Sequence, residues 1–281
     1  MKKIICLLIC LFAVFCFVGC GESGESMDLI EDGKLYVGTS TDYAPYEFLD
    51  LTKEGDEKYV GSDIALAKEI ANELGLELVI KVMAFDTLLA AIDSGKVDMV
   101  ISGLTKDPEG KREAGYLFSN SYFDEGEGDQ ILVFNKNKVN EYKSLEDLNK
   151  ADVKVAAQSG SVQQGLVEEQ LPNANKVWFE NINDALTALN AGQYDAVALA
   201  ATAATSLLTA EVNKELVMST FKFDMDDSCL YVLMKKGNEG LAKKVNPICD
   251  AAAAGKYQTW VDEANALFEQ LGDQAGELIP E

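Results

Sequence analysis

The sequence predicts an α/β protein of two similar lobes, each a parallel-rich sheet flanked by helices, joined by a two-strand hinge. Its 281 residues suffice for two ordinary domains. A β-α-β-α-β order occurs once in each half, and this order favours a parallel sheet with helices on its faces. In addition, an offset of 97 residues superposes a helix-Gly-strand unit of the first half on one of the second. Gly95 then falls on Gly192, and Asp98 falls on Asp195.

In the first half, residues 34–38 are expected to form a buried strand that runs into a polar turn. Ser62 is expected to cap a helix that ends at Gly75, because apolar residues recur on one face between them. The alternation over 76–82 predicts a strand. A short helix over 86–94 and a strand over 97–101 complete the unit.

The second half repeats this order. Its predicted elements are a strand over 153–157, a polar turn over 158–161, a helix over 162–170, a strand over 176–179, a helix capped by Asn183 and Asp184 and ending at Gly192, and a strand over 195–199. Apolar strands at 130–135 and 229–234 flank this half, and helices at 241–250 and 257–271 follow.

The two flanking strands indicate that the chain crosses into a second lobe and returns. Lobe 1 is then expected to comprise 28–131 and 231–281, and lobe 2 to comprise 132–230. In open α/β sheets a ligand binds at the carboxyl ends of the strands, so the site is expected between the lobes.

Charge and composition exclude several functions. The chain has 24 basic and 47 acidic residues, a formal net charge of -23, and so acidic a surface repels nucleic-acid phosphates. It has no histidine, which removes histidine-dependent nucleophiles and metal ligands. No metal-ligand spacing is present, and neither a metal nor a cofactor is expected. Arg112 is the one arginine, so any planar, two-pronged cation must come from this residue.

Residues 1–19 have the features of an export signal, a basic start followed by an apolar run that is short for a membrane span. The end of this segment resembles a bacterial lipobox, which implies lipidation of Cys20 and a tether over 20–27. An uncleaved N-terminal anchor is the alternative, and both place the chain at the outer face of a membrane. Beyond Cys20 only Cys229 and Cys249 remain, and they are expected as separate buried thiols rather than a disulfide.

Five segments in order resemble the extracytoplasmic solute-binding proteins of ABC importers for polar amino acids, family 3. They are VGTSTDYAPYEF (37–48), YVGSDIALA (59–67), Phe85-Asp86, GKVDMVISGLT (95–105) and FSNSYF (118–123). The resemblance implies a type II periplasmic-binding-protein-like fold, a monomer and no catalytic residue. It also implies a small amino acid or related carboxylate as ligand and the subunits of an ABC permease as partners.

The resemblance implies that groups from both halves hold the carboxylate of the ligand. Arg112 would supply a bidentate contact, and Thr105 its hydroxyl and amide. The helix start at Ser161, Val162 and Gln163 would add groups from the second half.

By the same resemblance, Tyr43 and Phe85 would form the aromatic walls around the side chain of the ligand. Ser102 and the Gly103 carbonyl would face its polar end, and Ser40 would also belong to the ligand-binding site. Ser40 stands where members specific for basic side chains have an acid, which argues against lysine or arginine as the ligand.

Two departures from the family pattern affect this site. Arg112 stands two residues beyond the family position, which a two-residue insertion explains, with Lys106 or Lys111 as alternatives. Ala200 stands where members that bind α-amino acids have an aspartate for the ammonium group. Either another acid replaces it (Glu180, or Asp226 and Asp227), or the ligand has no ammonium group. A neutral amino acid or a related carboxylate is the resulting hypothesis.

Two other functions stay open. The lobes could report ligand to a transporter or receptor as a sensor rather than feed uptake. Some relatives on this fold are prephenate- or arogenate-type dehydratases, for which Glu180 or Asp42 would be the candidate acid.

Overall fold

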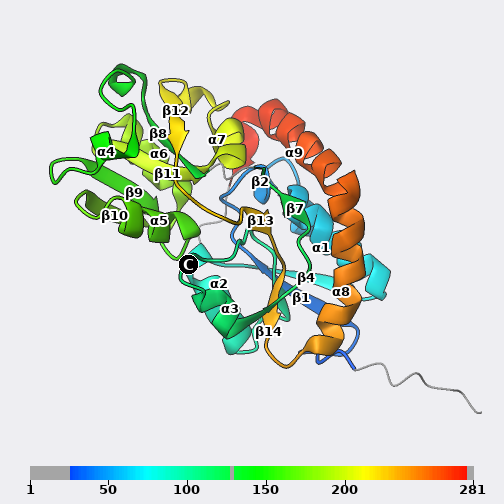
Figure 1. Cartoon of the computed structure of the whole chain (residues 1–281). Coiled ribbons are helices and arrows are strands. Elements are labelled where there is room, and N and C mark those ends of the chain that lie inside the picture. Colours follow the sequence, from blue (N-terminus) through cyan, green and yellow to red (C-terminus); the bar gives the residue numbers. More distant parts are fainter. Residues whose placement is uncertain (1–25, 127–129, 277–281) are drawn as a thin grey trace, which may run out of the picture.

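The computed structural model describes residues 26–126 and 130–276. The predicted signal peptide and Cys20 lie outside these residues. Two five-stranded sheets, each with helices on its faces, form two lobes (Figure 1). No helix in the described ranges is long and apolar enough to cross a membrane.

The sheet of the first lobe has the order β4-β1-β5-β14-β6. β1 runs parallel to β4 and β5, and β14 runs antiparallel to β5 and β6. The strands are β1 (Lys34–Thr39), β4 (Glu77–Val82), β5 (Met99–Val100), β6 (Tyr116–Phe118) and β14 (Leu233–Lys235). The helices are α1 (Ser62–Leu74), α2 (Leu88–Asp93), α3 (Lys111–Gly115), α8 (Glu239–Ala251) and α9 (Tyr257–Leu271). A three-stranded sheet comprises β2 (Phe48–Asp50), β3 (Tyr59–Val60) and β15 (Ala275–Gly276).

The sheet of the second lobe has the order β10-β9-β11-β8-β12. β10, β9 and β11 are parallel, and β8 runs antiparallel to β11 and β12. The strands are β8 (Gln130–Asn135), β9 (Lys154–Gln158), β10 (Asn175–Phe179), β11 (Ala196–Ala200) and β12 (Leu216–Lys222). The helices are α4 (Leu145–Leu148), α5 (Val162–Gln170), α6 (Ile182–Asn190) and α7 (Ala201–Leu207). Both sheets thus have three parallel strands followed by an antiparallel one, which confirms the predicted pair of similar α/β lobes.

The strand predicted over 229–234 is divided in two. β13 (Cys229–Leu230) pairs with β7 (Phe123–Asp124), whereas β14 enters the sheet of the first lobe. Between β13 and β14, Tyr231 N–H donates to the Leu104 carbonyl and Val232 N–H donates to Ser119 Oγ. These two residues are therefore bonded to other segments and do not continue either strand. The paired crossing strands are therefore β7 and β13, while the predicted crossing strand 130–135 is β8 of the second sheet. The lobe boundaries at 131/132 and 230/231 stay a prediction.

Two predicted helix caps are wrong by one or more residues. Gly61, not Ser62, precedes α1 at a φ of 120°, and a Cβ there would lie 2.2 Å from the Tyr46 carbonyl oxygen. Asn181, rather than Asn183 or Asp184, caps α6, because its side chain accepts hydrogen bonds from the N–H groups of those two residues.

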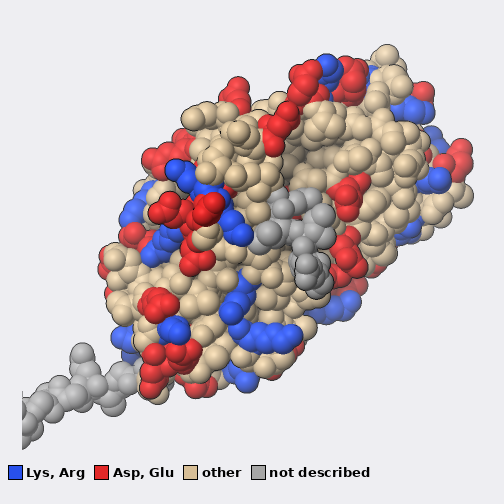
Figure 2. All heavy atoms as spheres, turned by 180° about the vertical axis from the view of Figure 1, so that it is seen from behind, with Lys and Arg blue, Asp and Glu red and all other residues tan. Residues whose placement is uncertain are grey.

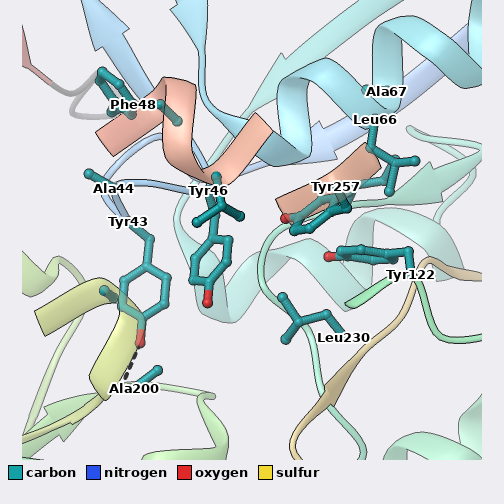
Figure 3. Packing of buried hydrophobic residues seen from close by; sticks show 14 of the residues in the cluster. Tyr43, Ala44, Tyr46, Phe48, Leu66, Ala67, Tyr122, Ala200, Leu230 and Tyr257 are labelled. Atoms are coloured by element: carbon teal, nitrogen blue, oxygen red, sulfur yellow. Dashed lines mark hydrogen bonds between the residues drawn. The ribbon is translucent and has the colours of Figure 1, made fainter. Parts of the chain in front are cut away.

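Apolar packing continues from one lobe into the other. Tyr43 of the first lobe and Ala200 of the second belong to one cluster of buried residues, and Figure 3 shows them in contact. On the outer side, Ser206 of α7 hydrogen-bonds Asn265 of α9. The lobes are therefore closed on each other. Elsewhere, Cys229 and Cys249 are separate thiols, but only Cys249 is buried as expected, since Cys229 is half-buried.

Candidate ligand-binding site

The predicted site residues follow the carboxyl ends of parallel strands. In the first lobe, Ser40 and Tyr43 follow β1, and 102–105 follow β5. In the second lobe, the turn 159–161 follows β9 and Ala200 ends β11. Because the lobes face each other at these ends, the polar turns of both sheets meet.

The guanidinium of Arg112 joins the two lobes. Nη1 donates to the Thr105 carbonyl at 2.8 Å, and Nη2 donates to the Gly160 carbonyl at 2.8 Å. Arg112 is 7% exposed, and burial lowers its pKa to about 10, so it stays charged at neutral pH. Within 26–126 and 130–276 no carboxylate lies within 4.0 Å of it. A buried cation without an anionic partner is costly, which makes this place suited to an anionic group.

The two lysines considered as alternatives are engaged elsewhere. Lys106 forms an ion pair with Asp227 at 2.8 Å and lies over the Tyr231 ring. Lys111 pairs with Glu109, and its side chain is 79% exposed. Arg112 is therefore the one of these three cations that reaches both Thr105 and the second lobe.

Thr105 and the start of α5 adjoin this guanidinium. The Thr105 side chain is 2% exposed, and its Oγ1 has no hydrogen-bond partner in the described structure. Ser161 caps α5 with its hydroxyl, and its own N–H donates to the Gln158 carbonyl at 3.2 Å. The N–H of Ser161 therefore already has an acceptor. The N–H groups of Val162 and Gln163, in the first turn, have no carbonyl acceptor within the helix.

The predicted aromatic walls come from separate turns. Tyr43 stacks on Tyr46 at 5.8 Å between centroids, and its hydroxyl accepts a hydrogen bond from Ala200 N–H at 3.1 Å (Figure 3). Burial raises the pKa of Tyr43, which keeps it neutral. Phe85 begins a 3-10 turn and is half-buried. Its neighbour Asp86 touches the second lobe, since a Cβ on Gly160 would lie 3.0 Å from Asp86 Cα.

The two serines meet at a carboxyl group that sequence reasoning missed. Ser102 Oγ donates to Glu47 Oε1 at 2.7 Å, and Ser40 Oγ donates to the same oxygen at 3.3 Å. Glu47 is fully buried, and its Oε2 has no partner in the described structure. Burial and the charge of Asp63 raise the pKa of Glu47 well above its ordinary value, so its neutral form is favoured.

Asp63 holds the loop that carries Gly103. Its Oδ2 accepts from Gly103 N–H at 2.6 Å and from Tyr122 O–H at 3.2 Å, and its Oδ1 accepts from Tyr257 O–H. Burial raises the pKa of Asp63 to about 6. The signal available in the sequence was an acid in the first turn of an apolar helix.

Asp42 forms a second junction between the lobes. Its Oδ2 accepts hydrogen bonds from Gln158 Nε2 at 2.8 Å and from Ile182 N–H at 3.2 Å, both in the second lobe. From the sequence, Asp42 was a candidate catalytic acid. In the structure its carboxylate instead accepts a hydrogen bond from the first residue of α6.

The acids proposed as substitutes for the missing aspartate are either exposed or bound to other groups. Glu180 is exposed and contributes its backbone carbonyl to Gln158. Asp226 is exposed, and Asp227 is bound by Lys106 and by the Tyr231 hydroxyl.

Acidic and basic side chains are interspersed on the face in Figure 2. The residues that the structure describes contain no group of three or more side chains arranged to hold a metal ion.

Two α/β lobes, joined by paired crossing strands and facing each other across buried polar groups, define a bilobed ligand-binding protein. The chain belongs to the bacterial extracellular solute-binding proteins, family 3, whose sequence model matches residues 35–263. It is a substrate-binding protein of an amino-acid ABC transporter with the expected periplasmic-binding-protein-like fold.

Named relatives share most of this chain. The arginine-binding extracellular protein ArtP of Bacillus subtilis (strain 168) is 35% identical over 200 residues, 70% of this chain and 72% of that protein. The ABC transporter glutamine-binding protein GlnH of the same strain is 31% identical over 286 residues, 94% and 98% of the two chains. The substrate-binding protein AbpA from Streptococcus pneumoniae Canada MDR_19A, solved bound to L-arginine, has a TM-score of 0.75 at 34% identity, covering 84% of this chain and 96% of that one.

Proposed function

We propose that this protein captures one small, neutral amino acid between its lobes and delivers it to an ABC permease. It would act as a monomer, tethered through lipidated Cys20 to the outer face of a bacterial cell membrane. The observation that carries the proposal is the buried Arg112 guanidinium, which bonds one carbonyl of each lobe and has no carboxylate partner in the described structure.

The carboxylate of the ligand would bind beside these carbonyls. Of the five N–H groups of a guanidinium, two of Arg112 bond Thr105 and Gly160, which leaves three as donors. The Thr105 hydroxyl, which has no partner among the described residues, and the first-turn amides of α5 supply further donors from each lobe. A ligand that bonds both lobes at once favours the closed state. The permease would recognise the protein in this closed state.

A neutral side chain suits the far end of the site. Ser40 and Ser102 both donate to Glu47, whose raised pKa favours the uncharged carboxyl. Serine hydroxyls beside a neutral carboxyl group can form hydrogen bonds with an amide or a hydroxyl of the ligand. No positive charge on the ligand is needed to balance the site. Glutamine, the ligand named for the relative GlnH, has a side chain of this kind.

A cationic side chain is the second candidate, and Glu47 Oε2 favours it. That oxygen is buried without a partner in the described structure, and a guanidinium that reached it would hold Glu47 ionised. ArtP and AbpA are both named for arginine.

Thermal-shift screening of the purified protein separates these candidates. The panel would contain L-glutamine, L-asparagine, L-arginine, L-lysine and small carboxylates without an ammonium group. We expect the largest stabilisation from a neutral amino acid. A larger shift with L-arginine would favour the second candidate, and no shift with any member would contradict the uptake function.

We further propose that the protein is not an enzyme. Asp42 is held by two donors and Glu180 is exposed, so neither acid is poised as a dehydratase would need. Glu47, the buried acid with a raised pKa, is the group such an activity would require. Incubation with prephenate or arogenate is expected to give no product, and product formed by wild type but not by Glu47→Gln would establish the enzyme instead.

A sensory role predicts that deleting the protein alters a response without altering uptake of the amino acid.

A further inference from the structure

Glu125 brings a carboxylate into the junction of the lobes from the segment that crosses between them. It follows β7, the crossing strand, and precedes β8 of the second sheet. Its Oε1 accepts from the Tyr46 hydroxyl of the first lobe, and its Oε2 accepts from Gln130 Nε2 of β8 at 3.5 Å. The carboxylate is thus bound to a neutral donor on each side of the junction.

These contacts place Glu125 beside Ala200. Gln130, which donates to Glu125, is the register partner of Ala200 across β8 and β11. Tyr46, the other donor, stacks on Tyr43, whose hydroxyl bonds Ala200 N–H. Figure 3 shows both tyrosine hydroxyls directed toward the second lobe. Consistent with this closeness, the charge of Glu125 helps to raise the pKa of Tyr43 and of Tyr46.

The hydrogen bonds around Glu125 extend to Gln163, which is a predicted site residue. Gln130 Oε1 accepts from Gln163 Nε2 at 2.6 Å, and Gln163 lies in the first turn of α5, near the turn that Arg112 bonds. A hydrogen-bonded chain therefore leads from Glu125 to the helix start proposed to hold the carboxylate of the ligand.

We propose that Glu125 binds the α-ammonium group of the ligand, in the place where Ala200 offers no charge. The inference rests on the proposed function, because it assumes an α-amino acid. An ammonium group buried without a negative partner would be costly, so an amino acid bound at Arg112 needs an acid nearby.

The other acids near the junction are less suited to this role. Asp42 already joins the lobes through Gln158 and Ile182. Glu47 is buried and accepts hydrogen bonds from Ser40 and Ser102. Glu180 is exposed, and Asp227 is bound by Lys106. Glu125 accepts hydrogen bonds from neutral side chains on both sides of the junction and lies beside the Ala200 position.

Titration calorimetry on the purified full chain tests this assignment. The probes are L-glutamine and L-arginine, with glutaramic acid and δ-guanidinovaleric acid as the counterparts that lack the ammonium group. Glu125→Gln keeps the shape and hydrogen-bonding reach of the side chain, and the matched control Glu180→Gln removes an exposed acid. We expect Glu125→Gln to bind the amino acid about 10- to 100-fold more weakly, while its affinity for the desamino counterpart stays at the wild-type value. Glu180→Gln is expected to match wild type for both.

Each outcome decides the matter. An unchanged affinity of Glu125→Gln for the amino acid would overturn the assignment and leave the proposed function intact. An equal loss for the amino acid and its desamino counterpart would also overturn it, because the effect would then not depend on the ammonium group. Binding of no amino acid by wild type would overturn the proposed function and this inference together.

Discussion

Arg112 Nη2 lies 2.8 Å from the Gly160 carbonyl oxygen, so the one arginine of the chain hydrogen-bonds across the junction between the lobes. Its other terminal nitrogen bonds Thr105 of its own lobe. A carboxylate bound at this guanidinium would thus lie where both lobes contribute donors. Binding of the ligand and closure of the lobes are then one event.

Thr105→Val should stabilise the free protein and weaken binding. The valine keeps the shape but removes a buried hydroxyl that lacks a partner in the described structure. We expect an increase of about 1 kcal/mol in the free energy of unfolding and a roughly 3- to 10-fold loss of amino-acid affinity. Thr39→Val is the matched control, since Thr39 Oγ1 is also buried without a described partner but lies within β1. Equal affinity for both variants would mean that the Thr105 hydroxyl does not touch the ligand.

Asp42→Ala should shift the protein toward an open form. It removes two hydrogen bonds that Asp42 accepts from the second lobe. Because hydrogen bonds to a charged group contribute about 1.5–3 kcal/mol, we expect at least a tenfold loss of affinity. Small-angle scattering should show a larger radius of gyration for this variant than for Asp226→Ala, which removes an exposed acid. A radius and an affinity equal to those of the control would contradict the closing role.

Glu47→Gln should flatten the dependence of stability on pH. The pKa of Glu47 is raised in the folded protein, so the native state keeps a proton that the unfolded chain has lost. Stability from this group is therefore complete below about pH 4 and is lost as pH rises through the folded pKa. Melting temperatures at pH 5 and pH 8 should differ less for Glu47→Gln than for wild type. A difference equal to that of wild type would mean that Glu47 is ionised throughout.

Gly61→Ala should destabilise the protein far more than Gly75→Ala. Both glycines flank α1 at positive φ, but only at Gly61 would a Cβ collide with backbone, 2.2 Å from the Tyr46 carbonyl oxygen. We expect a loss of about 3 kcal/mol or more for Gly61→Ala and about 1 kcal/mol for Gly75→Ala, measured by denaturant unfolding. Similar losses would show that the backbone near Tyr46 yields easily.

Strong periodicity made much of the fold predictable. The helix predicted over 162–170 is α5, whose start is capped by Ser161, and the one predicted over 257–271 is α9, which buries one apolar face. The return strand was predicted as continuous since 229–234 is apolar throughout. Its division depends on Leu104 and Ser119, which are distant in sequence and bond Tyr231 and Val232. Local pattern does not contain that information.

The site was predictable where a strand ends in a turn, as at Ser102 and Thr105. The buried acids were not, because an acid in an amphipathic segment is usually expected at the surface. Glu47 and Asp63 are buried because hydroxyl and amide donors from other segments converge on them. Glu125 was part of an acidic run, and only the pairing of β8 with β11 brings it beside Ala200.

Calorimetric titration of wild type and of Arg112→Lys with L-glutamine and L-arginine tests the central claim most directly. A lysine keeps the charge but not the planar fork that bonds Thr105, Gly160 and a carboxylate together. The account predicts one-to-one binding of one amino acid by wild type and a loss of at least about tenfold in Arg112→Lys. Wild-type affinity in Arg112→Lys would contradict a carboxylate clamp at this position.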